Sequence, residues 1–530
     1  MPAATGEITP DVSVPELALL DDYLKLYASE RPRALAVVGE QERMTYAELD
    51  AEVGRYAGAL AAHGIRTGDV VAVLGFSRPE CVVAFLATCR VGAVFLGLSP
   101  KQTERELAFV LGDSRPRLLF GLHSRSEPEQ DDKLAGLKGS GLEAAIVTRG
   151  GAVPGLSEAL DSFLEAGAVQ AARQRASSDA PCAIVYTSGS TGTPKGALLS
   201  QRGMIRSALL SWEHWYGGLQ PVRAVAQHPI NHVGWLICEC VATLVPGGTM
   251  FCQERFNGAG TLRLIERERL NLWLAFPSML ILAQDTPEFE RCDLTSLETI
   301  ALGMPASVEL MRAYRDRTGA VMCISYGLTE ANGGSVTVTA RDADLERIAT
   351  TIGRPVPGIE VRVMGFDGKP AGAGQEGEFL VRDRSVFLGY LNRPDATAEA
   401  LDADGWLHTG DVVRAEAGGE MRMVGRLKEM FKSGGYNVYP TEIEGVIGGH
   451  PEVAAVAVVE IPDPLWHEVG VAYVVPREGA AFSEEALRSY ARQRLANYKV
   501  PKRFVLVDTL PQLPNGKFDK VALRVQAKQG

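Results

Sequence analysis

The 530-residue chain has no long, uninterrupted apolar run. Its longest apolar stretch, residues 82–98 (VVAFLATCRVGAVFLGL), contains Arg90 and Gly92 and is short for a membrane span. We interpret it as a buried helix, a turn and a buried strand. The first residues, MPAATGEITPDVS, have neither the cationic start nor the apolar centre of a signal peptide. We therefore expect a cytoplasmic protein without a transmembrane segment.

Cysteine and positive charge also lack a functional pattern. None of the 8 cysteines has CxxC spacing, and Cys238 and Cys240 are too close to pair easily. We expect free, buried thiols in a reducing compartment. The net charge is −11, the pI is near 5.4, and no long basic cluster occurs, so nucleic-acid binding is not expected. A nucleotide-phosphate site in this acidic chain would need locally supplied positive charge.

The length and the apolar pattern indicate several domains. A chain of 530 residues with 46% hydrophobic content is too long for one ordinary core. Thr45 and Glu48 match a capping box before apolar residues at helical spacing. Apolar strand candidates follow, separated by helix-length segments, at residues 70–76, 144–148, 183–187, 272–276 and 298–303. This alternation predicts parallel α/β sheets.

The pattern changes in the last third of the chain. After about residue 350, short alternating strands with Gly/Asp turns predict a small, mostly antiparallel β subdomain. Beyond residue 430 we predict a helix, two strands, a helix and a strand, at residues 441–448, 453–461, 469–475, 483–497 and 503–507. These elements form an α+β unit of about 100 residues, which is large enough to fold separately.

Residues 186–196, YTSGSTGTPKG, have a composition that suits neither a core strand nor a helix. Glycine lets backbone N–H groups approach an anion, hydroxyl groups add donors, and Lys195 adds a point charge. A Walker A loop is excluded, because Pro194 and Gly196 stand where that motif needs glycine and Ser/Thr. The alternative is a solvated linker, but apolar runs flank the loop. We predict a phosphate-binding loop of another kind.

Several later segments carry reactive groups outside any apolar pattern: SYGLTEANGG (325–334), WLHTGD (406–411), GRLKEMFKSGGYNVYPTEIE (425–444) and PNGKFDK (514–520). Each could separately be a turn, a strand end or a helix cap. In this order, together with the loop at 186–196, they resemble the adenylate-forming superfamily of acyl-CoA synthetases, peptide-synthetase adenylation domains and luciferases. The resemblance covers nearly the whole chain. It implies a stand-alone ligase with ATP, Mg²⁺ and CoA.

The resemblance assigns nucleotide-binding and catalytic roles to residues of these motifs. Asp411 would accept the ribose hydroxyls, and Arg426 would reach the ribose or the phosphates. Thr329 would meet the α-phosphate, Glu330 would hold Mg²⁺, and Lys517 would stabilise the adenylation transition state. The remaining candidates are the adenine-sandwiching Gly303, Met304, Pro305 and Tyr326, and the phosphate-binding Thr187, Ser188, Gly189, Ser190, Thr191, Gly192, Thr193 and Lys195.

The resemblance also implies a second half-reaction, in which the thioester forms after the C-terminal domain rotates. Lys428 matches the hinge position, and Lys432 matches a lysine that some relatives use in the second conformation. Ser433, Gly434 and Gly435 would then let a pantetheine thiol pass. We therefore expect an N-terminal adenylate-forming domain of stacked α/β sheets plus the β subdomain at 1–425, a hinge at 426–429, and a small mobile α+β domain at 430–530.

The acyl site is expected around PINHVGW (229–235), with His232 flanking the carboxylate and His228 as a weaker candidate. The alternative for His232 is an ordinary structural histidine. Two glycines after YGLTE would leave room, which favours a bulky or hydrophobic acid over acetate. The other expected lining residues are Val233, Trp235, Gly327, Asn332, Gly333 and Gly334.

Three functions stay open at this point. The first is a carboxylic acid:CoA ligase that works through acyl-AMP, and Lys432 with the loop SGGY favours it. The second is an adenylating enzyme that delivers the acyl group to a separate carrier protein or partner enzyme. The third, a silent nucleotide-binding protein, would be indicated by loss of Lys517, Glu330 or Asp411, and all three are present. We expect a monomer or homodimer.

Overall fold

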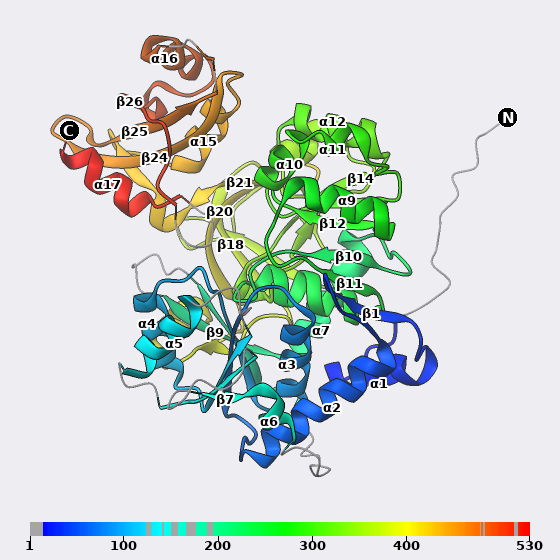
Figure 1. Ribbon diagram of the computed structural model, residues 1–530. Coiled ribbons are helices and arrows are strands. Elements are labelled where there is room, and N and C mark those ends of the chain that lie inside the picture. The colour runs from blue at the N-terminus through cyan, green and yellow to red at the C-terminus, as the bar shows by residue number, and fades with distance from the viewer. Residues whose placement is uncertain are drawn as a thin grey trace. The chain divides into compact units, whose positions relative to one another are not determined.

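The computed structural model contains two compact units, and each has its own sheets and core (Figure 1). The first comprises Met1–Glu360 with Val381–Leu407, and the second comprises Val361–Leu380 with His408–Gly530. The structure describes residues 14–122, 129–139, 143–149, 157–165, 176–187, 194–477, 479–480, 483–512 and 518–529.

A nine-stranded sheet organises one half of the first unit. Its central strands are parallel neighbours, as the alternation of strands and helices predicts. In spatial order the strands are β16 (Arg354–Pro355), β15 (Thr337–Val338), β14 (Val321–Tyr326), β13 (Thr299–Leu302), β12 (Leu272–Ala275), β10 (Arg223–Ala226), β11 (Thr249–Cys252), β1 (Leu35–Val38) and β2 (Arg43–Thr45).

An eight-stranded sheet organises the other half of this unit. Its strands β3 to β6 are parallel, and β8 and β9 form an antiparallel hairpin. In spatial order the strands are β19 (Gly389–Tyr390), β9 (Lys195–Ser200), β8 (Pro181–Thr187), β4 (Val94–Leu98), β3 (Val70–Gly75), β5 (Leu118–Leu122), β6 (Ala145–Thr148) and β7 (Glu158–Ala159).

Helices cover both sheets and bury their apolar strands. One core lies between the nine-stranded sheet and α9–α13, where Trp273 packs edge-on to Tyr314 (Figure 1). The helices are α1 (Leu20–Glu30), α2 (Tyr46–Ala62), α3 (Pro79–Arg90), α4 (Glu104–Ser114), α5 (Glu129–Gly139), α6 (Leu160–Glu165), α7 (Gln201–Leu210), α8 (Ala242–Leu244), α9 (Gly258–Glu268), α10 (Pro277–Gln284), α11 (Glu288–Arg291), α12 (Val308–Thr318), α13 (Leu345–Thr350) and α14 (Pro394–Ala400), with π-helices η1 (Ser211–Trp215) and η2 (Gly234–Val241) and the 3₁₀ turn η3 (Thr329–Ala331).

The second unit contains a four-stranded and a five-stranded sheet. The first sheet holds β17 (Glu360–Met364), β18 (Glu376–Arg382), β20 (Leu407–Ala415) and β21 (Met421–Arg426). The second holds β23 (Tyr436–Val438), β22 (Phe431–Ser433), β25 (His467–Pro476), β24 (Val453–Asp463) and β26 (Arg503–Leu506). The helical elements are η4 (Leu427–Glu429), α15 (Pro440–Gly448), α16 (Glu484–Arg492), η5 (Asn497–Lys499) and α17 (Lys520–Gln529).

The five-stranded sheet is apolar on both faces, because successive side chains of a strand point to opposite sides. Val456 and Val458 of β24 join a core with α15 and α16. Ala457 and Val459, between and beside them, join a second core with α17. The near-continuous apolar sequence of this strand therefore reflects helices packed on both faces.

Most sequence expectations for the fold are confirmed. The stretch 82–98 forms α3, a turn and β4, and Thr45 and Glu48 form the predicted capping box of α2. All 8 cysteines are free and buried. The helix expected at 483–497 is too long, because α16 ends at Arg492 and Leu495, beyond the helix, packs into the core. Among the described residues, no helix has the length and apolar character needed to span a bilayer.

The compact units divide the chain upstream of the expected boundary, because the four-stranded sheet groups mainly with the C-terminal residues. A hinge at 426–429 stays a prediction.

Candidate active site

Four neighbouring parallel strands, β10, β12, β13 and β14, end at one edge of the nine-stranded sheet. In open α/β sheets, ligands bind outside this carboxyl edge. The residues that follow the strands include His228, Phe276, Gly303 and Gly327. Three of these four are candidates from the sequence, and the sheet topology brings them to the same edge.

Phe276 connects two of the candidates. Its ring lies edge-on to His228, with 4.9 Å between the ring centres. A Cβ at Gly303 would lie 2.8 Å from Cε1 of Phe276, so the glycine lets the ring approach the backbone. Met304, beside Gly303, is 55% exposed, and Tyr326 ends the adjacent strand β14. Sequence reasoning missed Phe276, although its place between a buried strand and a proline marks it as a strand-end residue.

The turn after β14 has backbone that only small residues can form. A Cβ at Gly327 would overlap the carbonyl oxygen of Gly333, and Gly333 itself has φ 84°. Thr329 and Glu330 are half-buried in η3, and the Thr329 carbonyl accepts the Asn332 N–H at 3.0 Å. The Asn332 side chain is buried and donates to the Ser385 carbonyl. The turn therefore fixes Thr329 and Glu330 at the end of β14.

The room expected beside the two glycines is occupied by neighbouring side chains. A Cβ at Gly333 would lie 2.8 Å from Cγ2 of Val233, and one at Gly334 would overlap Oγ of Ser211. The structure thus brings Val233 and Gly333 together, as expected for residues of one site. The two glycines by themselves give no argument for a bulky acid.

His232 lies beside His228 with nearly parallel rings, whose centres are 6.4 Å apart and whose planes differ by 24°. Its Nδ1 accepts the Gly234 N–H at 3.0 Å, so the neutral ring carries its hydrogen on Nε2. Trp235 is fully buried, and its indole N–H donates to Oγ of Ser77 at 3.0 Å. Trp235 is therefore a core residue beneath this segment, and its place in an acyl pocket stays a prediction.

The expected phosphate loop connects β8 to β9, whose residues Thr187 and Lys195 pair with each other. Ser188, Gly189, Ser190, Thr191, Gly192 and Thr193 lie outside the described residues, as does Lys517. Lys195 places its Nζ 5.1 Å from the ring centre of Tyr390 in β19. The cation is thus held at the base of the hairpin turn.

Tyr390 links this cation to the expected metal ligand. Its hydroxyl donates to Oε1 of Glu330 at 2.7 Å, and the Glu330 carbonyl accepts the Phe387 N–H at 2.8 Å. Burial and the negative charge of Glu330 raise the pKa of Tyr390 well above its usual value, so the phenol stays a donor. Lys195 of β9 and Glu330 of η3 therefore both contact one tyrosine. Sequence reasoning did not single out Tyr390.

Glu330 is chemically suited to Mg²⁺, which takes oxygen ligands and usually keeps several from water or phosphate. The described part of the chain contains no group of three or more His, Cys, Asp or Glu side chains that could hold a metal. The ligands of a Mg²⁺ ion here would therefore be the Glu330 carboxylate, nucleotide phosphates and water.

In the second unit, Asp411 and Arg426 are directly opposite each other on β20 and β21. Nε of Arg426 lies 2.9 Å from Oδ1 of the buried Asp411. The backbone N–H of Gly410 donates to Glu378 at 3.1 Å. The two ribose candidates are thus in contact with each other across paired strands.

The expected thiol-passage loop is a tight two-residue hairpin. Gly434 and Gly435 connect β22 to β23 and have φ 58° and 87°, which a type I′ turn requires. The Gly434 N–H donates to the Trp466 carbonyl at 2.8 Å, and nothing lies within 4 Å of a Cβ built at Gly435. Ser433 is buried, and Lys432 is exposed. Turn geometry alone explains both glycines, so a role in CoA binding stays a prediction.

The segment after the expected hinge residue Lys428 is anchored to the C-terminal helix. Nζ of Lys520 in α17 lies 2.9 Å from both Glu429 and Glu444. Although burial opposes it, the charge of Lys520 lowers the pKa of Glu429, and the two carboxylates raise the pKa of Lys520. Burial dominates at Glu444 and raises the pKa of its carboxyl group. Glu429 is therefore fixed to α15 and α17.

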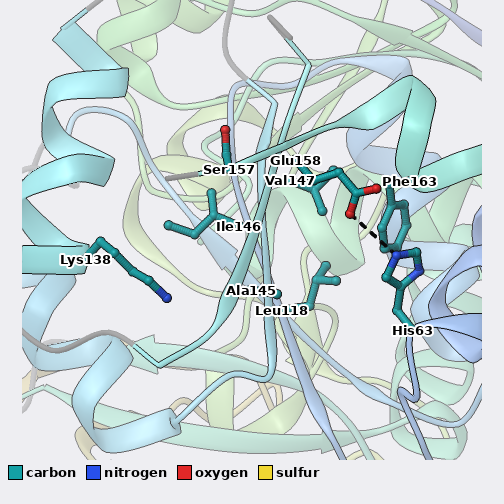
Figure 2. Close-up of a pocket in the computed structure, with 9 residues that line it drawn as sticks. All are labelled: His63, Leu118, Lys138, Ala145, Ile146, Val147, Ser157, Glu158 and Phe163. Atoms are coloured by element: carbon teal, nitrogen blue, oxygen red, sulfur yellow. Dashed lines mark ion pairs between the residues drawn. The ribbon is translucent and has the colours of Figure 1, made fainter. Parts of the chain in front are cut away.

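A surface pocket of about 360 Å³ lies elsewhere in the first unit, where β5 and β6 begin (Figure 2). Figure 2 shows His63 against Phe163 and Glu158, with Lys138 on the other side. Nε2 of His63 is 3.5 Å from Glu158. None of the sequence candidates lines this pocket, so it is distinct from the carboxyl-edge site.

Family models describe both units of the chain. The model "AMP-binding enzyme" matches residues 24–391, and "AMP-binding enzyme C-terminal domain" matches residues 442–517. This chain belongs to the AMP-binding enzyme family. The predicted membership in the adenylate-forming superfamily, and the prediction that the chain is an enzyme, are therefore confirmed.

Three similar proteins match nearly the whole length of this AMP-binding enzyme. A feruloyl-CoA synthase of an Amycolatopsis species is 36% identical over 506 residues, covering 93% of this chain and 96% of its own length. An indoleacetate–CoA ligase of Aromatoleum aromaticum is 33% identical, with coverage of 95% and 97%. The structure of an amide bond synthetase from Marinactinospora thermotolerans matches with TM-score 0.84 and 30% identity, covering 96% of this chain and 99% of its own. The predicted fold class is confirmed.

Proposed function

We propose that this enzyme is an AMP-forming carboxylic acid:CoA ligase that activates a hydrophobic acid. The observation that carries the proposal is the Lys195–Tyr390–Glu330 arrangement at the turn of the β8–β9 hairpin. It supplies a cation for phosphate and a carboxylate for Mg²⁺ within one connected group. The names of the relatives support CoA as the acceptor.

In the first half-reaction, a carboxylate oxygen of the substrate attacks the α-phosphorus of ATP. The bond from this phosphorus to the oxygen that bridges to the β-phosphate breaks, and pyrophosphate leaves. Lys195 and the hydroxyl groups of the hairpin turn would orient and neutralise the leaving phosphates. Glu330 would hold Mg²⁺, which when bound neutralises phosphate charge. Lys517 would stabilise the charge that develops between the carboxylate and the α-phosphate. Asp411 and Arg426 would bind the ribose.

In the second half-reaction, the thiolate of CoA attacks the acyl carbonyl carbon, and AMP leaves. Rotation about Lys428 would withdraw Lys517 and present Lys432 with the Ser433–Gly435 turn. The anchoring of Glu429 to α17 supports a hinge at 426–429 whose last residue moves with the C-terminal helices. We further propose that the enzyme works in the cytoplasm, as a monomer or homodimer.

The acid is proposed to be hydrophobic and aromatic. Phe276 and Val233 give the carboxyl edge an apolar lining, and His232 offers an N–H to the substrate carboxylate. Feruloyl and indoleacetyl groups, which occur in the names of two relatives, are both aromatic.

A second candidate function is adenylation followed by transfer to an acceptor other than free CoA. The similarity to a structure named as an amide bond synthetase favours keeping it. A carrier protein, a partner enzyme or an amine would then take the acyl group.

Pyrophosphate release, measured against a panel of carboxylic acids with and without CoA, tests both candidates. Acid-dependent release that yields acyl-CoA by mass spectrometry is the expected result. Release that yields only bound acyl-AMP, unchanged by CoA, would favour the second function. No release with any acid, despite ATP binding by calorimetry, would contradict both.

A further inference from the structure

A buried His–Glu pair lies directly behind the carboxyl edge of β10. Nδ1 of His228 is 2.6 Å from Oε1 of Glu239 in η2, and the two side chains are 2% and 1% exposed. The backbone N–H groups of Gln227 and His228 donate to the same carboxylate at 3.2 Å. A carboxylate that already accepts two N–H groups accepts the third from the imidazole. Nδ1 of His228 therefore carries hydrogen and is bound to Glu239.

The other nitrogen of this ring is left for another partner. Within the described part of the chain, Nε2 of His228 is buried and makes no hydrogen bond. A buried polar atom without a partner destabilises the fold. A histidine that only filled the core could be replaced by an apolar residue without this cost. One nitrogen fixed by a carboxylate and the other left open is the arrangement of a histidine that contacts a ligand.

The ring of His228 is positioned within the candidate acyl site. It meets Phe276 edge-on at 4.9 Å and lies parallel to His232 at 6.4 Å. A Cβ at Gly234 would lie 2.9 Å from His232 Nδ1 and 3.4 Å from His228 Cγ, so the glycine lets the two rings converge. η2 is a π-helix, a form that is common at functional sites, and it carries Glu239 back towards β10.

The geometry points to His228 as a specificity-determining residue that hydrogen-bonds a hydroxyl group on the acyl substrate, with Glu239 as its positioning residue. A hydroxyl suits the open nitrogen in either charge state, because it can donate to a neutral imidazole or accept from an imidazolium. With the aromatic acid proposed above, the substrate class is a hydroxylated aromatic acid. This inference rests on the proposed function and deepens it.

The test uses matched acids that differ only in one hydroxyl group. Benzoate and cinnamate are compared with their 2-, 3- and 4-hydroxy derivatives, alongside aliphatic acids, by kcat/KM for CoA-dependent pyrophosphate release. One hydroxy isomer is expected to exceed its parent acid by about 10- to 100-fold, the range of one buried hydrogen bond. His228→Leu is expected to remove this preference, measured as the ratio of kcat/KM for the hydroxy acid to kcat/KM for its parent acid.

Glu239→Gln serves as the second variant. It keeps the side-chain shape and weakens the hold on Nδ1, so the ratio of kcat/KM for the hydroxy acid to kcat/KM for its parent acid should fall. The matched control is His63→Leu, the same change at the His63–Glu158 pair away from the carboxyl edge (Figure 2). This control should leave the preference unchanged. A merely structural defect would lower both acids together and leave their ratio intact.

Three outcomes overturn the inference. The wild-type enzyme could turn over parent or aliphatic acids with no preference for any hydroxy isomer, in which case the ligase stands and the inference fails. The preference could persist in His228→Leu, or in Glu239→Gln should the first variant not fold. No pyrophosphate release with any acid would overturn the proposed function and this inference with it.

Discussion

Gly327→Ala tests whether the turn after β14 forms part of the active site. A Cβ at this position would overlap the carbonyl oxygen of Gly333 and lie 2.7 Å from the carbonyl carbon, where ordinary contacts measure 3.4–4 Å. Both contacting atoms belong to the backbone, so no side chain can rotate away. The turn must therefore open and displace Thr329 and Glu330, which it fixes at the strand end.

The expected loss is large in activity and moderate in stability. Displacing catalytic groups by roughly 1 Å costs on the order of 10²-fold in rate, and overpacking of this kind costs about 1–3 kcal/mol of folding free energy. Pyrophosphate release gives the rate, and thermal unfolding by circular dichroism gives the stability. The variant should still fold at the assay temperature, so the loss of activity cannot be attributed to unfolded protein.

The matched control is Gly112→Ala, on an exposed turn of α4 where nothing lies within 4 Å of the added Cβ. It should keep full activity and gain about 0.5–1 kcal/mol, since glycine is unfavourable within a helix. Wild-type activity in Gly327→Ala would refute the placement of this turn in the site. Equal losses in both variants would show that the assay reports general damage.

The remaining predictions concern three charged or hydrogen-bonding groups. Lys520→Met should destabilise the protein by about 3 kcal/mol at neutral pH, because Glu429 and Glu444 lose their buried cation. Chemical denaturation should show that this loss of unfolding free energy becomes smaller as pH falls and the two carboxylates become protonated. In the wild type, the raised pKa of Lys520 contributes stability that is lost only as pH rises through it, and the lowered pKa of Glu429 contributes stability that is lost as pH falls through it. A pH-independent deficit would contradict the charge argument. Tyr390→Phe keeps the ring beneath Lys195 but removes the donor to Glu330. The Mg²⁺ concentration needed for half-maximal pyrophosphate release should therefore rise about 10-fold, and added Mg²⁺ should restore the rate. An unchanged Mg²⁺ concentration would argue against Glu330 as a ligand. Lys517→Ala should cut pyrophosphate release by about 10²–10³-fold and spare thioester formation from supplied acyl-AMP, whereas equal loss of both steps would refute separate conformations.

Local pattern was sufficient for the elements that local chemistry determines. The capping box of Thr45 and Glu48 and the apolar strand predicted at 70–76 follow from side-chain period and hydrogen-bonding capacity. The capping box formed as predicted, and the strand formed as β3, which ends at Gly75. The end of α16 at Arg492 was not predicted, since Leu495 beyond the helix packs into a core that includes the distant Phe431 and Val458. Glycines were ambiguous for the same reason. Gly434 and Gly435 satisfy a hairpin turn, and Gly333 and Gly334 make way for Val233 and Ser211, so neither pair needs a ligand to explain it.

The residues that sequence reasoning missed share one property, which is that their partners are distant in the chain. Tyr390 is notable only because Glu330 lies 2.7 Å from its hydroxyl, and Phe276 only because His228 and Gly303 meet its ring. Glu239 stands in the apolar run GWLICECV, where period alone offers no reason for a carboxylate. A charge at such a position is costly unless a partner compensates it. Here His228 and two backbone N–H groups compensate the charge of Glu239. Because Glu239 binds one nitrogen of His228, the other nitrogen is positioned to bind a ligand.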